Sequence, residues 1–353
     1  MPSIEILDTG RLDERDSAFP QAVQLPNGDI LCSFSVGGGP NATGGSDWAR
    51  SRDGGLTWSL EGTILPATVE PPTRNALRLS VSPNGQTLYA YGSRSYSGAE
   101  FGKAQNEAVF CRSSDGGHTW SAPQTIPKPM DCPLEVSHAV TALASGRLLA
   151  PAATLPAQDR LGEQVVVAIS DNGGETWPRH ALVFQDPDKK LGYFEHKLAE
   201  FAAGRVIAVC WTVTLGDVAD QPDSFTISND NGTSWGPAHS TGVNGQTMTP
   251  IALGGDRLLV LYNRRYGDQG IVVNLVTFSE ETWTVHYEGL LYEARAKRRR
   301  PANVESGVEE LDTFKFGFPT AIRLQDGTYL ATHWCKESGA FGIRWTKLRV
   351  DWP

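Results

Sequence analysis

The sequence predicts an all-β protein, a six-bladed β-propeller of four-stranded antiparallel sheets. Two internal repeats carry this prediction, and no interval of the chain shows sustained helical periodicity. The first repeat occurs four times, as SRDGGLTW, SSDGGHTW, SDNGGETW and SNDNGTSW. The second repeat occurs six times and consists of an apolar strand, a turn with Gly or Asp, and another apolar strand. We therefore expect six similar units in series.

The first repeat has the chemistry of a hairpin turn. Its copies end at Trp58, Trp120, Trp177 and Trp235, which lie 62, 57 and 58 residues apart, and a decayed copy ends at Trp283. The Asp or Asn of each copy accepts hydrogen bonds from backbone amides, glycine supplies positive φ, and the Trp begins the next strand with a buried indole. The copies lack the further carboxylates of a calcium loop, so we interpret them as structural.

The second repeat sets the number of units. Its turns are 52 to 71 residues apart, which leaves room for four strands of about five residues in each unit. Six such sheets close radially into a propeller, and few strand edges remain unpaired. We expect Ile4–Leu7 and Ile343–Val350 to complete one blade between them. Because no linker-like stretch divides the chain, residues 1–353 are predicted to form a single propeller domain.

The composition narrows the class of protein. The net charge of −9 argues against a nucleic-acid partner. The chain has no run of about 18 apolar residues and no basic, then apolar, start, which predicts a cytoplasmic protein without a membrane partner. Its five cysteines are widely spaced and form no C-x-x-C pair, so neither a disulfide framework nor a zinc site is indicated. We expect no cofactor, and the sequence does not indicate an oligomeric state.

The four S-x-D-x-G-x-T-W segments on six four-strand units resemble the sialidase superfamily, whose repeated Asp boxes lie on a six-bladed propeller. The resemblance covers nearly the whole chain. It implies a site in which three arginines bind the substrate carboxylate, a tyrosine paired with a glutamate is the nucleophile, and an aspartate is the acid/base. It also implies a carbohydrate substrate.

This chain departs from the family pattern at three positions. Ala18 and Trp211 stand where the resemblance implies the first and second arginines, and Phe318 stands where it implies the nucleophilic tyrosine. The glutamate falls on Glu195. Since phenylalanine cannot attack an anomeric carbon, and since two carboxylate partners are missing, we do not expect a true sialidase.

Other candidate residues lie at the starts of the inner strands, which ring one mouth of a propeller channel. Their mixture of carboxylates, imidazoles, a phenol and cations suits a carbohydrate. The catalytic candidates are Glu195, Glu135, His138, His196 and Tyr193, and the substrate-binding candidates at the same offset are Arg74, Arg264, Lys315 and Gln246. The resemblance adds Asp47, near the position that it implies for the acid/base aspartate, Arg265, which with Arg264 could match the third arginine, and Trp211 to the substrate-binding candidates. The two carboxylates could instead pair with these cations, and the two histidines could be neutral channel residues or a metal pair. No H-x-H or H-E-x-x-H spacing supports a metal, so none is predicted.

The leading hypothesis is a carbohydrate-active enzyme, a glycoside hydrolase with Glu195 and Glu135 as a carboxylate pair. Arg264 or Arg265 would orient an anionic or polyhydroxylated sugar, and propeller exo-arabinanases offer a precedent by analogy for the pair. The second hypothesis is a uronate lyase, in which a cation neutralises the uronate and a His or Tyr removes the C5 proton. Its candidate residues are Tyr193, His196 and Arg264. The third is a glycan-binding propeller without catalysis.

Overall fold

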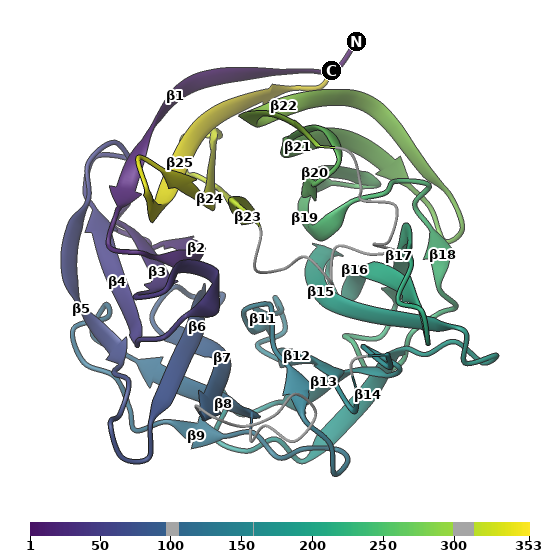
Figure 1. The fold of residues 1–353 in the computed structure, drawn as a ribbon, viewed down its shortest axis with the longest axis horizontal. Coiled ribbons are helices and arrows are strands. Elements are labelled where there is room, and N and C mark those ends of the chain that lie inside the picture. The colour runs from purple at the N-terminus through teal and green to yellow at the C-terminus, as the bar shows by residue number, and fades with distance from the viewer. Residues whose placement is uncertain (97–105, 158, 299–313) are drawn as a thin grey trace.

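The computed structural model describes residues 1–96, 106–157, 159–298 and 314–353 and confirms the predicted architecture. Figure 1 shows six antiparallel sheets arranged around one central axis. Blade one contains β2 (Ala18–Gln24), β3 (Ile30–Ser35), β4 (Ser46–Ser51) and β5 (Ser59–Leu65). Blade two contains β6 (Thr73–Val81), β7 (Leu88–Tyr96), β8 (Asn106–Ser113) and β9 (Gln124–Thr125). Blade three contains β10 (Leu134–Glu135), β11 (Thr141–Ala142), β12 (Leu148–Thr154), β13 (Val165–Ser170) and β14 (Arg179–Phe184).

Blades four to six complete the ring. Blade four contains β15 (Leu191–Ala202), β16 (Arg205–Thr214), β17 (Asp220–Ser228) and β18 (His239–Ser240). Blade five contains β19 (Gln246–Gly254), β20 (Arg257–Arg264), β21 (Gly267–Phe278) and β22 (Trp283–Arg298). Blade six contains β23 (Phe316–Arg323), β24 (Tyr329–Glu337), β25 (Ala340–Asp351) and β1 (Ser3–Asp13). Blade three is irregular because its inner strand is divided into β10 and β11, which both pair with β12. A short 3-10 helix, η1 (Gly39–Asn41), follows β3.

The two ends of the chain close the ring in blade six, as predicted. β1 pairs antiparallel with β25, with Ile4 opposite Val350. Figure 1 shows both termini side by side at this blade. The pairing holds the first strand against the last, so the sixth sheet depends on residues from both ends of the sequence.

The core lies between neighbouring blades. Each apolar cluster combines side chains from two successive sheets; for example, Leu149 and Val167 of blade three pack with Val206 and Cys210 of blade four. The apolar strands therefore face one another around the ring, and burial of these faces stabilises the fold by about 25 cal/mol per Å² of apolar surface. This packing holds the six inner strands at the axis.

The repeat turns, which we define as the four S-x-D-x-G-x-T-W segments, have the predicted hydrogen bonds. In the first, Asp53 accepts hydrogen bonds from the Thr57 amide at 2.9 Å and the Thr57 hydroxyl at 2.5 Å. Ser51 donates to Asp53 at 2.7 Å and accepts from the Gly55 amide at 2.9 Å. The hydrogen bonds from Thr57 lower the pKa of Asp53 to about 2. The carboxylate thus ties the turn together.

The expected burial of the four indoles is correct only for Trp177, which is 4% exposed. Trp58, Trp120 and Trp235 are half-buried and pack against the rims of apolar clusters.

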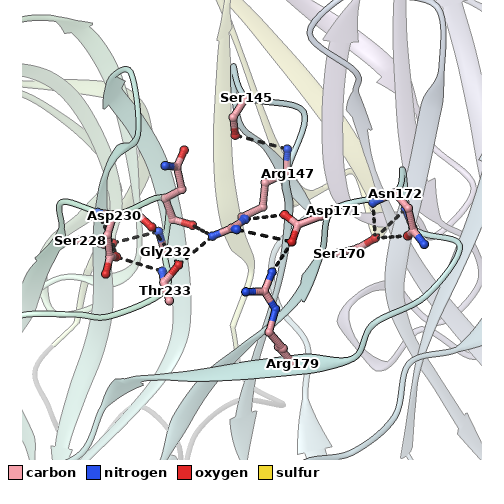
Figure 2. Close-up of polar contacts among 12 residues, drawn as sticks. Ser145, Arg147, Ser170, Asp171, Asn172, Arg179, Ser228, Asp230, Gly232 and Thr233 are labelled. Atoms are coloured by element: carbon pink, nitrogen blue, oxygen red, sulfur yellow. Dashed lines mark hydrogen bonds and ion pairs between the residues drawn. The ribbon is translucent and has the colours of Figure 1, made fainter.

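Arginines connect the repeat turns across blade boundaries. Arg147 of blade three donates to Asp171 at 2.7 Å and, in blade four, to the Thr233 hydroxyl at 2.7 Å and the Asn231 carbonyl at 3.2 Å. Figure 2 shows the Arg147 guanidinium between Asp171 and the turn that contains Thr233. Arg50 of blade one makes a similar contact with the Gly116 carbonyl of blade two at 2.6 Å. These contacts connect blade three to blade four and blade one to blade two.

Candidate active site

Four inner strands share a backbone irregularity at the axis. Phe19, Glu195, Thr247 and Phe318 have φ values of 57°, 50°, 56° and 50°, and the pairing of each strand shifts register at this point. Residues other than glycine rarely adopt this left-handed conformation, and such strain is concentrated at functional sites. A bulge of this kind re-aims a side chain. All four residues line one cavity.

The cavity has a volume of about 330 Å³ and is lined by one equivalent residue from every unit. Each lies nine residues before the turn position of its unit; they are Phe19, Ala76, Ser137, Glu195, Thr247 and Phe318. The residues two positions further along form a buried second tier, made of Gln21, Arg78, Ala139, Lys197, Thr249 and Thr320. The equivalence between units therefore produces two successive tiers of side chains, and Arg78 of the second tier also lines the cavity.

Two carboxyl groups from adjacent blades line this cavity. Glu135 is at the end of β10 in blade three, and Glu195 is at the bulge of β15 in blade four. The Glu195 amide donates to Glu135 Oε2 at 3.3 Å, and the Thr247 hydroxyl donates to Glu195 Oε2. Burial, and then the negative charge of Glu195, raise the pKa of Glu135 to about 8, although the Arg78 cation acts in the opposite direction. Glu135 therefore retains its proton at neutral pH.

Two buried arginines also line the cavity. Arg78 is 3% exposed, lies 4.6 Å from the centre of the Phe318 ring, and donates to the Val136 carbonyl at 3.0 Å. Arg265 is 6% exposed, lies 3.8 Å from the centre of the Phe314 ring, and donates to Gln246. Burial lowers the pKa of Arg78 to about 10 and that of Arg265 to about 9. Both values lie above 7, so both side chains are cations at neutral pH.

A buried lysine lies in the second tier, next to the Phe318 ring. Lys197 is fully buried, and its Nζ donates to the Thr249 hydroxyl at 2.7 Å and to the Pro319 carbonyl at 3.3 Å. It lies 3.9 Å from the centre of the Phe318 ring. Burial lowers the pKa of Lys197, although the negative charge of Glu195 opposes this.

Arg78 and Lys197 are functional candidates that the sequence analysis missed. They interrupt apolar inner strands at the same offset, two residues after the lining positions. This shared offset of two cations in apolar strands is the signal that could have identified them.

Three further predicted residues are at the cavity or support it. Trp211 lines it, stacks on Phe194 with ring centroids 4.5 Å apart, and donates to Asp220 at 2.9 Å. Arg74 also lines it and donates to the Asn41 carbonyl at 3.1 Å. Gln246 is outside the lining but accepts the hydrogen bond from Arg265.

The aromatic and imidazole candidates lie outside the cavity lining. Tyr193 precedes the bulge, so its ring points between the blades and stacks on Phe184 with centroids 5.1 Å apart. His196 lies between Glu195, which lines the cavity, and Lys197 of the second tier. It is 2% exposed, and burial lowers its pKa to about 3. Burial also lowers the pKa of His138. Both imidazoles are neutral at pH 7, and neither lines the cavity.

The remaining charged candidates also lie elsewhere. Arg264 pairs with Glu288 at 3.1 Å and lines a second groove, to which Gln246 and Arg265 also contribute, but it does not line the cavity that contains the two carboxyl groups. Lys315 is exposed outside the cavity. Asp47 is on the third strand of blade one, where it accepts hydrogen bonds from Thr63 at 2.7 Å and Arg15 at 3.1 Å. The inner-strand register, together with the bulge, decides which candidates meet.

The described part of the chain contains no cluster of three His, Cys, Asp or Glu residues arranged to hold a metal ion. All five cysteines are free thiols. Within the same residues, no helix has the length and apolar character needed to cross a membrane. The cavity lining contains carboxyl, guanidinium, hydroxyl and amide groups as well as aromatic rings.

Comparison with known proteins identifies related folds. The BNR repeat-like domain family matches residues 48–330. No curated protein sequence matches the chain. A protein of unknown function from Dyadobacter fermentans has a similar structure, with a TM-score of 0.77, 20% identity, and coverage of 99% of this chain and 100% of that chain.

Two enzymes have similar structures. The α-L-arabinanase from Penicillium chrysogenum, in complex with arabinobiose, has a TM-score of 0.66 and 18% identity, and the match covers 97% of this chain and 98% of that chain. The NanB sialidase from Streptococcus pneumoniae, as a point mutant, has a TM-score of 0.66 and 10% identity, with 98% of this chain and 70% of that chain covered. At these identities the likeness shows a shared fold.

Proposed function

The chain belongs to the BNR repeat-like domain family and has a sialidase-like propeller fold, and on this premise we propose that it is a glycoside hydrolase. In this proposal Glu135 is the general acid and Glu195 is the second carboxylate. The proposal treats residues 1–353 as a single propeller domain, which is supported by the pairing of β1 with β25. One observation carries it: two carboxyl groups from adjacent blades line the same cavity, where burial and the charge of Glu195 raise the pKa of Glu135 to about 8.

The difference between the two carboxyl groups matches the chemistry of glycoside hydrolysis. The reaction needs one carboxylic acid that protonates the leaving oxygen and one carboxylate that assists attack at the anomeric carbon. Glu135 would donate its proton as the C–O bond breaks. Glu195, oriented by the Thr247 hydroxyl, would attack the anomeric carbon or remove a proton from the attacking water. The anomeric configuration of the product distinguishes these two roles.

The rest of the cavity suits a sugar ring. Phe19, Phe318 and Trp334 form an aromatic wall against which the apolar face of a sugar can pack. Arg265, held by Gln246 and the Phe314 ring, provides donors for hydroxyl or carboxylate oxygens. Because the Penicillium chrysogenum arabinanase shares this fold, arabinose-containing glycosides are the first substrates to test.

The lyase hypothesis loses its structural support. It relied on Tyr193, His196 and Arg264, and none of these lines the cavity with the carboxyl groups. A glycan-binding propeller without catalysis needs no carboxylic acid with a raised pKa. The observations at Glu135 therefore favour the hydrolase.

The proposal is tested with a panel of 4-nitrophenyl glycosides, disaccharides and uronate-containing oligosaccharides. The hydrolase releases reducing ends from at least one compound, without the ultraviolet absorbance of an unsaturated uronate. Replacement Glu195→Gln preserves shape and should lower turnover by about 10²-fold or more, whereas Asp47→Asn, which removes a carboxylate outside the cavity, should not. An unsaturated product would establish the lyase instead, and binding without turnover would establish the glycan-binding protein.

A further inference from the structure

One face of blade two presents a row of polar side chains to the cavity. Arg74 on β6 is paired with Ser95 on β7, and Ser95 is paired with Asn106 on β8. Directly paired residues project from the same face of a sheet, so these three side chains lie side by side. Ser93, two residues before Ser95, is on the same face. We call Arg74, Ser93, Ser95 and Asn106 the polar row, and all four line the cavity.

This face of blade two packs against the strand that carries Glu135. Further along the same face, Tyr91 and Phe110 join an apolar cluster with Leu134 and Val136, the residues on either side of Glu135. β8 is in contact with β10, and Arg78 of blade two donates to the Val136 carbonyl at 3.0 Å. Glu135 is therefore positioned where blade three meets the polar row.

The two sides of the cavity differ in chemistry. Blades six and one contribute the aromatic rings of Phe318, Trp334 and Phe19. The polar row of blade two contributes two small hydroxyl groups, an amide and a guanidinium. The buried Oδ1 of Asn106 has no hydrogen-bond partner among the residues that the structure describes. A buried acceptor without a partner is unfavourable, so this atom is available to a donor from a ligand.

A general acid must lie within hydrogen-bond distance of the oxygen that it protonates, which belongs to the leaving group. The leaving group must therefore be next to Glu135, and its further atoms extend towards the polar row. We propose that the polar row is a leaving-group subsite for a second sugar, so that the substrate is a disaccharide or longer oligosaccharide. The sugar that is cleaved then packs on the aromatic side. This inference rests on the proposed hydrolase function.

The test compares two leaving groups on the same cleaved sugar. The probes are 4-nitrophenyl arabinofuranoside with arabinobiose, 4-nitrophenyl xyloside with xylobiose, and 4-nitrophenyl glucoside with cellobiose. The measured quantity is the ratio of kcat/KM for the disaccharide to kcat/KM for the aryl glycoside. The ratio does not depend on the fraction of correctly folded enzyme, because both substrates report on the same preparation.

The variants are Ser95→Ala, Asn106→Ala and the two combined. Each removes hydrogen bonds to a second sugar, which 4-nitrophenol cannot form to the same extent, so the ratio should fall by about tenfold in the combined variant. Ser80→Ala is the matched control, because Ser80 is on β6 of the same blade and its buried hydroxyl has no hydrogen-bond partner in the described part of the chain, but it does not line the cavity. Its ratio should equal that of the wild type.

An unchanged ratio in the combined variant would overturn the inference, as would an equal loss with Ser80→Ala. If the wild type hydrolyses none of the probes, the proposed function fails rather than the subsite. Calorimetric titration with arabinobiose, xylobiose and cellobiose then tests the polar row directly. A tenfold weaker affinity in the combined variant supports the subsite, and equal affinity overturns it.

Discussion

The raised pKa of Glu135 leads to a prediction that does not require a known substrate. With a pKa of about 8, about nine in ten Glu135 side chains are protonated at pH 7, whereas at the ordinary value of 4.5 only about one in three hundred would be. Two causes raise the pKa, burial and the negative charge of Glu195, and the first is larger. Glu195→Gln removes only the charge. The pKa of Glu135 should therefore fall below 8 but remain above 4.5.

Removal of a positive charge near Glu135 should shift its pKa in the other direction. Arg78 lowers the pKa of Glu135, so Arg78→Met should raise it further. Asp47→Asn is the control, because this carboxylate is in blade one, outside the cavity. Carbon-13 NMR of glutamate labelled at the side-chain carboxyl measures the titration, and the Glu135 signal is the one that disappears in Glu135→Gln. A wild-type midpoint near 4.5, or a midpoint that does not respond to Glu195→Gln, would refute the electrostatic argument.

Three other predictions concern stability and specificity. Gly232→Ala should destabilise the fold by about 2–4 kcal/mol in chemical denaturation, because φ is 75° and a new Cβ would lie 2.6 Å from Leu149. Gly146→Ala is the control: φ is also positive there, but no atom lies near the new Cβ, so the free energy of unfolding should fall by only about 1 kcal/mol. Because the pKa of Asp53 is lowered to about 2, its stabilising contribution is present above about pH 4 and is lost as the pH falls towards 2; Asp53→Asn should flatten this part of the stability curve, and parallel curves would contradict it. With Phe318 in place of the nucleophilic tyrosine, the protein should release no sialic acid from sialyl-lactose, and efficient release would show that this assignment is wrong.

The fold could be predicted because it is encoded by repeated local signals. Each repeat turn uses the same chemistry, as the hydrogen bonds of Asp53 show. The apolar strands around each turn position alternate in a manner that neighbouring blades can bury. The closing strand pair, with Ile4 opposite Val350, followed from the count of strands. Repeated structural units of this kind are therefore visible as repeats in the sequence.

The site was less predictable because a bulge breaks that periodicity. Simple alternation places the side chains of Glu195 and Lys197 on one face of a strand and that of His196 on the other. The positive φ at Glu195 shifts the register of strand pairing. No glycine stands at this position, so the sequence contains no signal for the positive φ. Tyr193 consequently joined the candidates although it lies between blades, while Lys197 was overlooked. The convergence of Glu135 and Glu195 was expected because the sequence analysis placed both at the starts of inner strands, although in the structure Glu135 ends β10 and Glu195 lies within β15.

The role of Glu135 as general acid is the central claim, and the leaving-group dependence of Glu135→Gln tests it most directly. The variant is compared with the wild type on a disaccharide, whose leaving hydroxyl needs a proton, and on the corresponding 2,4-dinitrophenyl glycoside, whose leaving group departs without one. The account predicts that kcat/KM falls by about 10²-fold or more on the disaccharide and far less on the dinitrophenyl glycoside. An equal loss on both substrates, or no loss on the disaccharide, would contradict it.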